Sequence, residues 1–528
     1  MAHRVLVADD LSAEGVEILR RAGLQVDVRL GMKPEELESA IGDYDGVAVR
    51  SATKITARVL EKGTRLKVVG RAGVGVDNVD LDAATRRGVV VMNTPGGSSV
   101  TVAELTLAMM LALARHIAQA TASVKAGKWE KKRFQGRELA GKTLGVVGIG
   151  NIGSVVVDRA RAMKMDVVAY DPFISPEIAA QLGVQVVALD ELWRRADVVS
   201  LHVPLTDQTR NIVNAGTIAK MRKGALIVNC ARGGLVDEKA LADALLSGQL
   251  GGAALDVFET EPVPADHPLL KVDTFVCTPH LGASTEEAQA AVAVAIAEQL
   301  AAYLTTGEVR NAVNVPAMSR EALERFGPYI ALGERLGALA AQIAPSGTRE
   351  VRISFAGELG EAPQRPITSA VLKGILSSFE SSPVNAVNAP AVARERGLAV
   401  SEERSAGAQD YASLLSVAVR GQGGEALVAG TVFGKRDPRI VRVNQFRLEA
   451  VPEGNIILSE NDDAPGVVGN IGATLGAAGV NIARISLSRD DARSAAVSLI
   501  NVDSAPSDDL LERLRRLPHV RQVRRIQL

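Results

Sequence analysis

Cysteine, net charge and long apolar runs are all scarce in this sequence. Only two of the 528 residues are cysteines, Cys230 and Cys277, and both lie in apolar runs with strand character. Two such thiols do not make a disulfide framework, so we expect both to be buried and reduced. A reducing compartment implies a cytoplasmic protein.

Charge of one sign is missing as well. The 60 basic and 61 acidic residues leave a formal net charge of −1, which gives no sequence-wide reason to expect a nucleic-acid or membrane-surface partner. The longest membrane-like run, residues 105–114, is about half of the roughly 20 residues that a spanning helix needs. The first residues, MAHRVLVADD, end in two acids and do not have the pattern of a signal peptide.

A glycine-rich motif is the strongest feature that is present. Residues 144–153 read LGVVGIGNIG, an apolar run followed by G-x-G-x-x-G and a helix-compatible segment. In this setting the first glycine makes a tight turn, the second lets the backbone approach a pyrophosphate, and the third allows close packing of helix and strand. The phosphates would lie at the helix N-terminus. The predicted cofactor contacts here are Gly148, Gly150, Asn151, Ile152 and Gly153.

An acid completes this motif. The next predicted strand, residues 166–170, is followed by Asp171, about 20 residues beyond Gly150. A carboxylate there can accept both ribose hydroxyls and would repel a 2′-phosphate, which favours NAD over NADP. The alternative is a glycine-rich turn in another α/β protein, but strand, helix, second strand and acid together favour a dinucleotide site.

Strand and helix signals alternate along the chain and predict an α/β protein. Residues 4–92 have a flavodoxin-like rhythm, and residues 139–283 that of a Rossmann unit. If the alanine-rich helix expected at 284–305 returns to the first unit, two lobes face each other across a cleft. The composition then changes: residues 318–451 suggest a mixed domain, and residues 454–528 have a βαββαβ rhythm.

Between the two lobes we expect one long helix and a basic loop. Thr101 and Glu104 have the spacing of a capping box, and the apolar helix that they open would run to about Gln119. Residues 125–137, KAGKWEKKRFQGR, are polar and basic. They form either a solvated loop or a segment whose basic residues, such as Arg133, reach an anionic ligand in a neighbouring subunit.

Two further loops follow predicted strands. Arg50 and Ser51 come after the run GVAV, and RAGVGVD starts at Arg71. Exposed backbone N–H groups beside two arginines suit an anion. Spacing alone leaves open the alternative that the arginines are surface charges and the glycines serve only a turn.

Three residue types needed for hydride transfer also follow predicted strands. His280 can act as acid/base, Glu261 can orient and charge-stabilise its imidazole, and Arg232 can hold a carboxylate bidentately. A single histidine is more often structural, and His202 in LHVPLT competes for the same role. The residues alone leave this assignment open.

The motifs together resemble those of the D-isomer-specific 2-hydroxyacid dehydrogenases, up to about residue 316. The matching stretches are VGIGNIG with its acid, LHVPLT, NCARGGLVDEKAL, GAALDVFETEP and TPHLGASTEEAQ. The resemblance implies that Arg232, Glu261 and His280 are the catalytic trio, with His280 as acid/base. It also implies NAD as cofactor, with additional contacts at His202, Pro204, Thr209 and Asp256.

The same resemblance implies a domain division. Residues 1–95 and 284–316 would form the substrate-binding domain, with the NAD-binding Rossmann domain, 96–283, inserted between them. Long-form members of the family add an intervening domain, here 317–452, and a C-terminal ACT regulatory domain, here 453–528. The predicted fold is therefore two Rossmann-like and flavodoxin-like α/β lobes with a cleft, an α+β intervening domain and a βαββαβ ACT domain.

Long-form members oxidise 3-phosphoglycerate to 3-phosphohydroxypyruvate, the first step of L-serine biosynthesis. RSATKIT and RAGVGVDNVD match their substrate loops. The resemblance implies that substrate is bound by Arg50, Ser51, Val74 and Gly75, with Arg133 reaching it from a partner subunit.

The resemblance also suggests an effector. L-serine would bind between paired ACT domains, held by Asn461, Asp463 and Asn481. A dimerisation module without a ligand is the alternative for this region.

The sequence thus predicts a cytoplasmic, serine-inhibited, NAD-dependent dehydrogenase of 3-phosphoglycerate. We expect a homodimer or homotetramer without a metal ion. One alternative is a reductase of hydroxypyruvate, glyoxylate or a 2-oxo diacid, which would use the same trio. The other is an NAD-sensing, corepressor-like binding protein.

Overall fold

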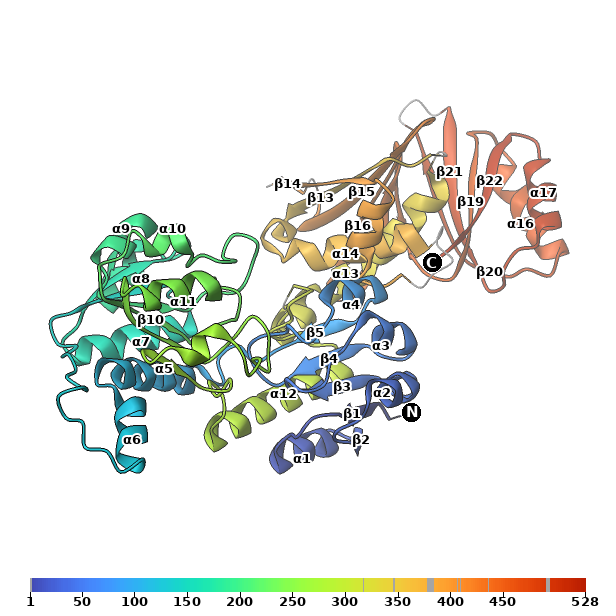
Figure 1. Ribbon diagram of the computed structural model, residues 1–528. Helices are drawn as coiled ribbons and strands as arrows, with labels where there is room; N and C mark the ends of the chain where they lie inside the picture. The colour runs from blue at the N-terminus through green and yellow to red at the C-terminus, as the bar shows by residue number, and fades with distance from the viewer. Residues whose placement is uncertain are drawn as a thin grey trace.

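Four β-sheets divide the chain into four parts along its length (Figure 1). The computed structural model describes residues 2–316, 318–344, 347–377, 384–405, 407–408, 410–434, 436–490 and 494–528. The first two sheets are parallel and form the two expected α/β lobes, so the predicted fold class is confirmed.

The first lobe contains a five-stranded parallel sheet in the order β2-β1-β3-β4-β5. Its inner strands are apolar and almost wholly buried, as a sheet covered on both faces requires. The strands are β1 (Arg4–Val7), β2 (Gln25–Val28), β3 (Gly46–Val49), β4 (Val68–Arg71) and β5 (Val90–Met92). The helices are α1 (Ala13–Arg21), α2 (Pro34–Ala40), η1 (Ile41–Asp43), α3 (Ala57–Lys62) and α4 (Leu81–Arg87).

A distant segment returns to this lobe. Helix α12 (Glu286–Thr306) packs on α1, β3 and β4, where a Cβ on Gly70 would lie only 2.8 Å from Ile296. Beyond the helix, Asn314 accepts a hydrogen bond from Val91 N at 2.9 Å. In the described part of the chain α12 is the one unbroken helix with the length and composition of a membrane span, and half of that stretch is buried. We retain the domain boundaries given above as a proposal.

The second lobe contains a seven-stranded parallel sheet in the order β12-β11-β10-β9-β6-β7-β8. The order reverses between β6 and β9, which is where open α/β sheets bind their ligands. Its strands are β6 (Thr143–Val147), β7 (Asp166–Tyr170), β8 (Gln185–Val186), β9 (Val198–Leu201), β10 (Ala225–Asn229), β11 (Leu250–Leu255) and β12 (Phe275–Cys277). Its helices are α5 (Ser99–Ala114), α6 (Ile117–Lys125), α7 (Asn151–Ala162), α8 (Pro176–Leu182), α9 (Leu189–Arg195), α10 (Ala215–Ile218), α11 (Glu238–Leu246) and η2 (Pro268–Lys271).

Three local predictions for this lobe were wrong. The long helix to Gln119 is two helices, α5 and α6, bent by 64° at His116, whose φ of 53° cannot continue an α-helix. The helix also starts at Ser99, so Thr101 lies inside it and caps nothing. Cys230 is buried, but Cys277 is exposed because it ends the edge strand β12, beside the cleft.

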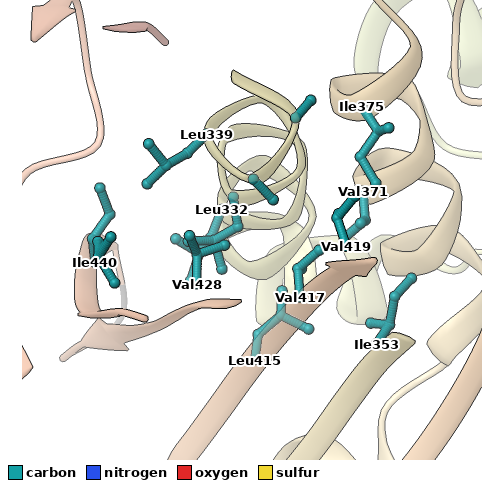
Figure 2. Close-up of a cluster of buried hydrophobic side chains, with 14 of the residues drawn as sticks. Leu332, Leu339, Ile353, Val371, Ile375, Leu415, Val417, Val419, Val428 and Ile440 are labelled. Atoms are coloured by element: carbon teal, nitrogen blue, oxygen red, sulfur yellow. The ribbon is translucent and has the colours of Figure 1, made fainter. Parts of the chain in front are cut away.

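The third sheet is mixed, with the order β14-β13-β15-β16-β17-β18. Figure 2 shows Leu332 and Leu339 of its long helix packed toward Leu415, Val417 and Val428 of the sheet. The helices are α13 (Arg320–Ile343), η3 (Glu358–Glu361), α14 (Gln364–Ser377) and α15 (Ala389–Glu395). The strands are β13 (Glu350–Gly357), β14 (Ala399–Ser405), β15 (Ser413–Gly421), β16 (Gly424–Phe433), β17 (Asp437–Val443) and β18 (Phe446–Ala450).

The fourth sheet is antiparallel and has the order β20-β21-β19-β22. With its two helices it has the predicted βαββαβ connectivity. The elements are β19 (Asn455–Asp462), α16 (Val467–Ala477), β20 (Ile482–Arg489), β21 (Ala495–Val502), α17 (Asp508–Arg515) and β22 (Val520–Gln527).

Candidate active site

The carboxyl ends of strands from both lobes meet at a cavity of about 620 Å³, which we call the catalytic cavity. The first lobe contributes Arg50 and Ser51 after β3 and Arg71 at the end of β4. The second contributes Glu261 after β11 and His280 after β12. Folding therefore brings two of the three predicted catalytic residues next to two of the predicted substrate residues.

His280 and Glu261 form a hydrogen-bonded pair. His280 Nδ1 lies 2.8 Å from Glu261 Oε2, while Glu261 Oε1 accepts from Phe258 N at 2.9 Å. A carboxylate on Nδ1 fixes the ring orientation and stabilises the imidazolium. No hydrogen bond to Nε2 is present among the described residues, so this nitrogen can exchange a proton with a ligand.

The buried carboxylate of Asp256 holds the loop that carries His280. Asp256 is only 1% exposed, and its oxygens accept from Thr278 Oγ1 at 2.5 Å, Leu281 N at 2.7 Å and Gly282 N at 2.8 Å. Its main-chain oxygen accepts from His280 N at 2.9 Å. These bonds support the left-handed φ of 55° at His280. Asp256 was predicted as a cofactor contact, and that role stays a prediction.

Arg232 lies beside the catalytic cavity and reaches across to the first lobe. Its Nε is 3.2 Å from Asp77 Oδ2, in the loop after β4. Gly75 leaves room for this guanidinium, since a Cβ there would overlap Arg232 Nη2. Val74 precedes Gly75 in the chain, and the Val74 carbonyl accepts a hydrogen bond from Asn93 Nδ2 at 2.5 Å. The three predicted residues thus share one corner of the cleft.

Positive charge is concentrated in this corner. Burial, together with the smaller effect of the nearby Arg232 and Arg50 charges, lowers the pKa of the Arg71 guanidinium to about 10. Arg71 Nε is buried without a hydrogen-bond partner in the described part of the chain. Buried cations that outnumber their carboxylates favour a bound anion. The geometry supports the anion-site alternative for both arginine loops.

Residues that the motifs did not reveal hold the Arg50 loop. Asp9 accepts from Arg50 N at 2.6 Å and from Thr53 Oγ1 at 2.6 Å. Asn78 donates to the carbonyls of Arg50 at 2.8 Å and Thr53 at 2.7 Å. Asp9 lies two residues after β1, at the same sheet edge, and this was the one available sequence signal.

The glycine loop has the shape that a dinucleotide requires. Gly148 has a φ of 93°, and a Cβ on Gly153 would overlap Gly148 O. Around Gly150 nothing lies within 4 Å of a Cβ position, so the backbone is open to a phosphate. Helix α7 starts at Asn151, and among the described residues no side chain caps its N-terminus, so its N–H groups can receive that phosphate. These residues fit an NAD pyrophosphate.

The remaining predicted cofactor residues surround this loop. Asp171 accepts from Ile149 N at 2.8 Å and from Phe173 N at 2.8 Å, so its carboxylate lies beside the loop. Ile152 packs partly into the core below it. In the loop after β9, Thr209 Oγ1 donates to Pro204 O at 2.6 Å.

His202 is less suited to the acid/base role than His280. Burial lowers the pKa of its imidazole to about 4. Its Nε2 lies 2.8 Å from Ser200 Oγ, and its carbonyl lies under Gly148. The contact with NAD stays a prediction. No cluster of three or more metal-ligating side chains occurs among the described residues.

Arg133 is not part of the catalytic cavity of its own chain. Its guanidinium is exposed and pairs with Asp273 at 2.9 Å. A role toward the substrate therefore depends on a second copy of the chain and stays a prediction.

The predicted effector residues lie at opposite ends of β19. Asn461 and Asp463 adjoin its C-terminal end, and Asp463 pairs with Arg489 at 3.2 Å. Asn481 donates to Asp503 Oδ2 at 2.7 Å, beside the N-terminal end. Strand geometry separates these ends by about 20 Å, so one chain does not assemble the three side chains around one ligand. Asn461 Oδ1 is buried without a partner in the described part of the chain.

Three family models match the chain. They are the D-isomer specific 2-hydroxyacid dehydrogenase NAD-binding domain over residues 107–282, the D-3-phosphoglycerate dehydrogenase intervening domain over 325–444, and the ACT domain over 456–519. The matches follow the order of the second, third and fourth sheets.

Relatives of the same length share one name. The chain is 43% identical over 526 residues to D-3-phosphoglycerate dehydrogenase of Methanocaldococcus jannaschii, covering 99% of this chain and 100% of the relative. It is 42% identical over 516 residues to that of Archaeoglobus fulgidus, with coverages of 97% and 98%. The solved NAD⁺-bound 3-phosphoglycerate dehydrogenase of Entamoeba histolytica is 33% identical, with a TM-score of 0.51, and covers 60% of this chain and 99% of its own.

Fold and site together define an NAD-dependent dehydrogenase of the D-isomer specific 2-hydroxyacid class. Within this class, the chain belongs to the D-3-phosphoglycerate dehydrogenase family.

Gly153→Ala tests the cofactor loop. The added methyl overlaps Gly148 O, so the loop must shift, and we expect the Kd for NADH, measured by fluorescence titration, to rise at least tenfold. The control is Gly327→Ala in α13, where a Cβ meets nothing within 4 Å. An unchanged Kd in Gly153→Ala would contradict the assignment.

Proposed function

We propose that the protein oxidises 3-phosphoglycerate to 3-phosphohydroxypyruvate with NAD⁺, the first step of L-serine biosynthesis. The observation that carries the proposal is the His280–Glu261 pair in one cavity with Arg50 and Arg71. An acid/base group next to cations suits a substrate that carries both a phosphate and a carboxylate. Full-length relatives named for this reaction support it.

The substrate is held by charge. Arg232, beside the cavity, binds the carboxylate and the C2 oxygen, because a guanidinium fork matches a carboxylate bidentately. Arg50 and Ser51 bind the phosphate at the far side, together with main-chain N–H groups of the Val74–Gly75 turn. Asp77 keeps Arg232 oriented until the substrate arrives.

The proton then moves at His280. NAD⁺, which the 148–153 loop would hold, would supply the acceptor for the hydride that leaves C2 of the substrate. His280 Nε2 takes the proton of the C2 hydroxyl as the carbonyl forms, and Glu261 stabilises the resulting imidazolium through Nδ1. In the reverse direction the same nitrogen returns the proton to the carbonyl oxygen.

L-serine is the proposed effector, and it requires two copies of the chain. The amine and carboxylate of serine suit the carboxylate of Asp463 and the amide of Asn481. Because these residues lie at opposite ends of β19, a site joining them takes Asp463 from one ACT domain and Asn481 from another. We therefore propose that the protein is a homo-oligomer, a dimer or tetramer. We also propose a cytoplasmic location.

The two alternatives are less well supported. Hydroxypyruvate and glyoxylate carry no second anionic group for Arg50 and Arg71 in the cavity. A 2-oxo diacid does carry one, but the full-length relatives are named for 3-phosphoglycerate. A corepressor-like NAD sensor needs no hydrogen-bonded His280–Glu261 pair with a free ring nitrogen.

His280→Ala tests the acid/base role. We expect kcat to fall at least 10³-fold, in the range of general acid–base contributions, while the Kd for NADH stays within twofold. Glu261→Gln keeps a hydrogen-bond partner for the ring but removes its charge, so kcat should fall about 10²-fold. Glu259→Gln, two residues away and exposed, is the matched control and should retain activity within twofold. A loss of NADH binding in His280→Ala would indicate a structural role instead.

Substrate and effector are tested together by initial rates of NADH oxidation. The substrates are 3-phosphohydroxypyruvate, pyruvate, glyoxylate and 2-oxoglutarate, each with and without L-serine, with D-serine as control. We expect the phosphorylated oxo acid to be preferred at least 100-fold in kcat/KM and its turnover to be suppressed by L-serine alone. Preference without suppression would overturn the serine proposal; no turnover of any oxo acid would overturn the enzyme assignment.

A further inference from the structure

A second and larger cavity lies between the first lobe and the third part of the chain. It has a volume of about 1060 Å³ and is bounded by residues 64–67, the C-terminal end of α4, residues 384–388 and the end of α15. Figure 1 shows α4, in blue, against the yellow and orange part of the chain. We call this second cavity the junction cavity.

Positive charge dominates this cavity. Its two carboxylates are Asp45 and Glu395, and its five basic residues are Arg65, Lys67, Arg86, Arg87 and Arg396. Asp45 is already shared between Arg65 at 3.0 Å and Lys67 at 3.5 Å. Within the described residues Arg86 and Arg87 have no ion pair.

A neutral donor also lines the cavity. Burial raises the pKa of the Tyr303 phenol, so its hydroxyl keeps its proton at neutral pH and can donate a hydrogen bond. Mixed cationic and hydroxyl donors on one cavity wall are the groups that bind phosphate oxygens.

The two parts that form the cavity are joined by specific hydrogen bonds. Asn385 Nδ2 donates to Gly88 O at 3.0 Å, and Asn388 Nδ2 donates to Arg86 O at 3.1 Å. These amides satisfy carbonyls at the C-terminus of α4, a duty that Arg86 and Arg87 would otherwise share. Their side chains are therefore available to a ligand.

The junction cavity is separate from the catalytic cavity. Lys67 immediately precedes β4, whereas Arg71 ends that strand, so the two cavities lie at opposite edges of the first sheet. They share no lining residue. Substrate bound at the catalytic cavity cannot neutralise the charges at the junction.

We propose that the junction cavity binds a small polyanion with phosphate groups, which bridges the first lobe and the third part of the chain. The volume suits a small-molecule ligand. The excess of guanidinium and ammonium groups from both sides suits an anion that carries at least two negative charges. Such a ligand would favour the relative position of the two parts seen here, because it contacts both.

The test uses the full chain and inorganic pyrophosphate, with binding measured by isothermal titration calorimetry at fixed ionic strength. The variant Arg86→Glu/Arg87→Glu reverses two charges at the end of α4. The matched control, Arg20→Glu/Arg21→Glu, makes the same change in the last turn of α1, in the same lobe and away from the cavity. Turnover of 3-phosphohydroxypyruvate is also measured for all three proteins, as a check that the catalytic cavity is intact.

We expect the wild type and the control to bind one equivalent of pyrophosphate per chain at the junction cavity. Affinity for that equivalent should be at least tenfold weaker in the variant, and all three proteins should turn over within twofold. If the double variant does not fold, Arg87→Gln alone should weaken binding at least threefold. The same stoichiometry and affinity in variant and wild type, or equal weakening in the control, would overturn the junction site without affecting the proposed dehydrogenase.

Discussion

The active site depends on one buried carboxylate. Asp256 is 1% exposed and accepts hydrogen bonds from the Thr278 hydroxyl and the amides of Leu281 and Gly282. A buried charge is tolerated only when such donors surround it, and each charge-assisted bond contributes about 1.5–3 kcal/mol. The bonds force the chain after β12 to turn back on itself, and this turn presents His280 to Glu261. Catalysis therefore rests on a side chain that need not touch the substrate.

Three arginines give this active site its positive charge. Arg50, Arg71 and Arg232 approach one another at the carboxyl ends of β3, β4 and β10, with Asp77 as the carboxylate that pairs with Arg232. Like charges held this close repel, and an anion with two charged ends relieves that repulsion. His280, Glu261 and Arg232 belong to the second lobe, whereas Arg50 and Arg71 belong to the first, so the relative position of the lobes decides whether the two halves of the site meet. In the junction cavity, too, basic residues lie between two parts of the chain, the first lobe and the third part.

The sequence was most informative where chemistry depends on local spacing. Gly148, Gly150 and Gly153 could be assigned from their order after a strand, and the structure gives each the space predicted for it. The alternation of strands and helices likewise predicted the first two sheets, and the βαββαβ rhythm predicted the fourth, but the short helices α3 and α4 and the four consecutive strands β15 to β18 were missed. The break at His116 went unseen because a single left-handed residue leaves no periodic signal in the sequence. Asp9, Asn78 and Asp77 act through contacts far apart in the chain, and Asp463 and Asn481 were grouped although β19 separates them; spacing alone cannot show either.

The most direct test is to measure kcat and the Kd for NADH of the variant Asp256→Asn. Asparagine keeps the shape of the side chain but replaces one acceptor oxygen with a donor, which leaves an amide of the 278–282 loop without its partner. The account predicts that kcat with 3-phosphohydroxypyruvate falls at least tenfold while the Kd for NADH stays within threefold. Wild-type turnover, or a loss confined to NADH affinity, would contradict it and would instead make Asp256 a cofactor contact.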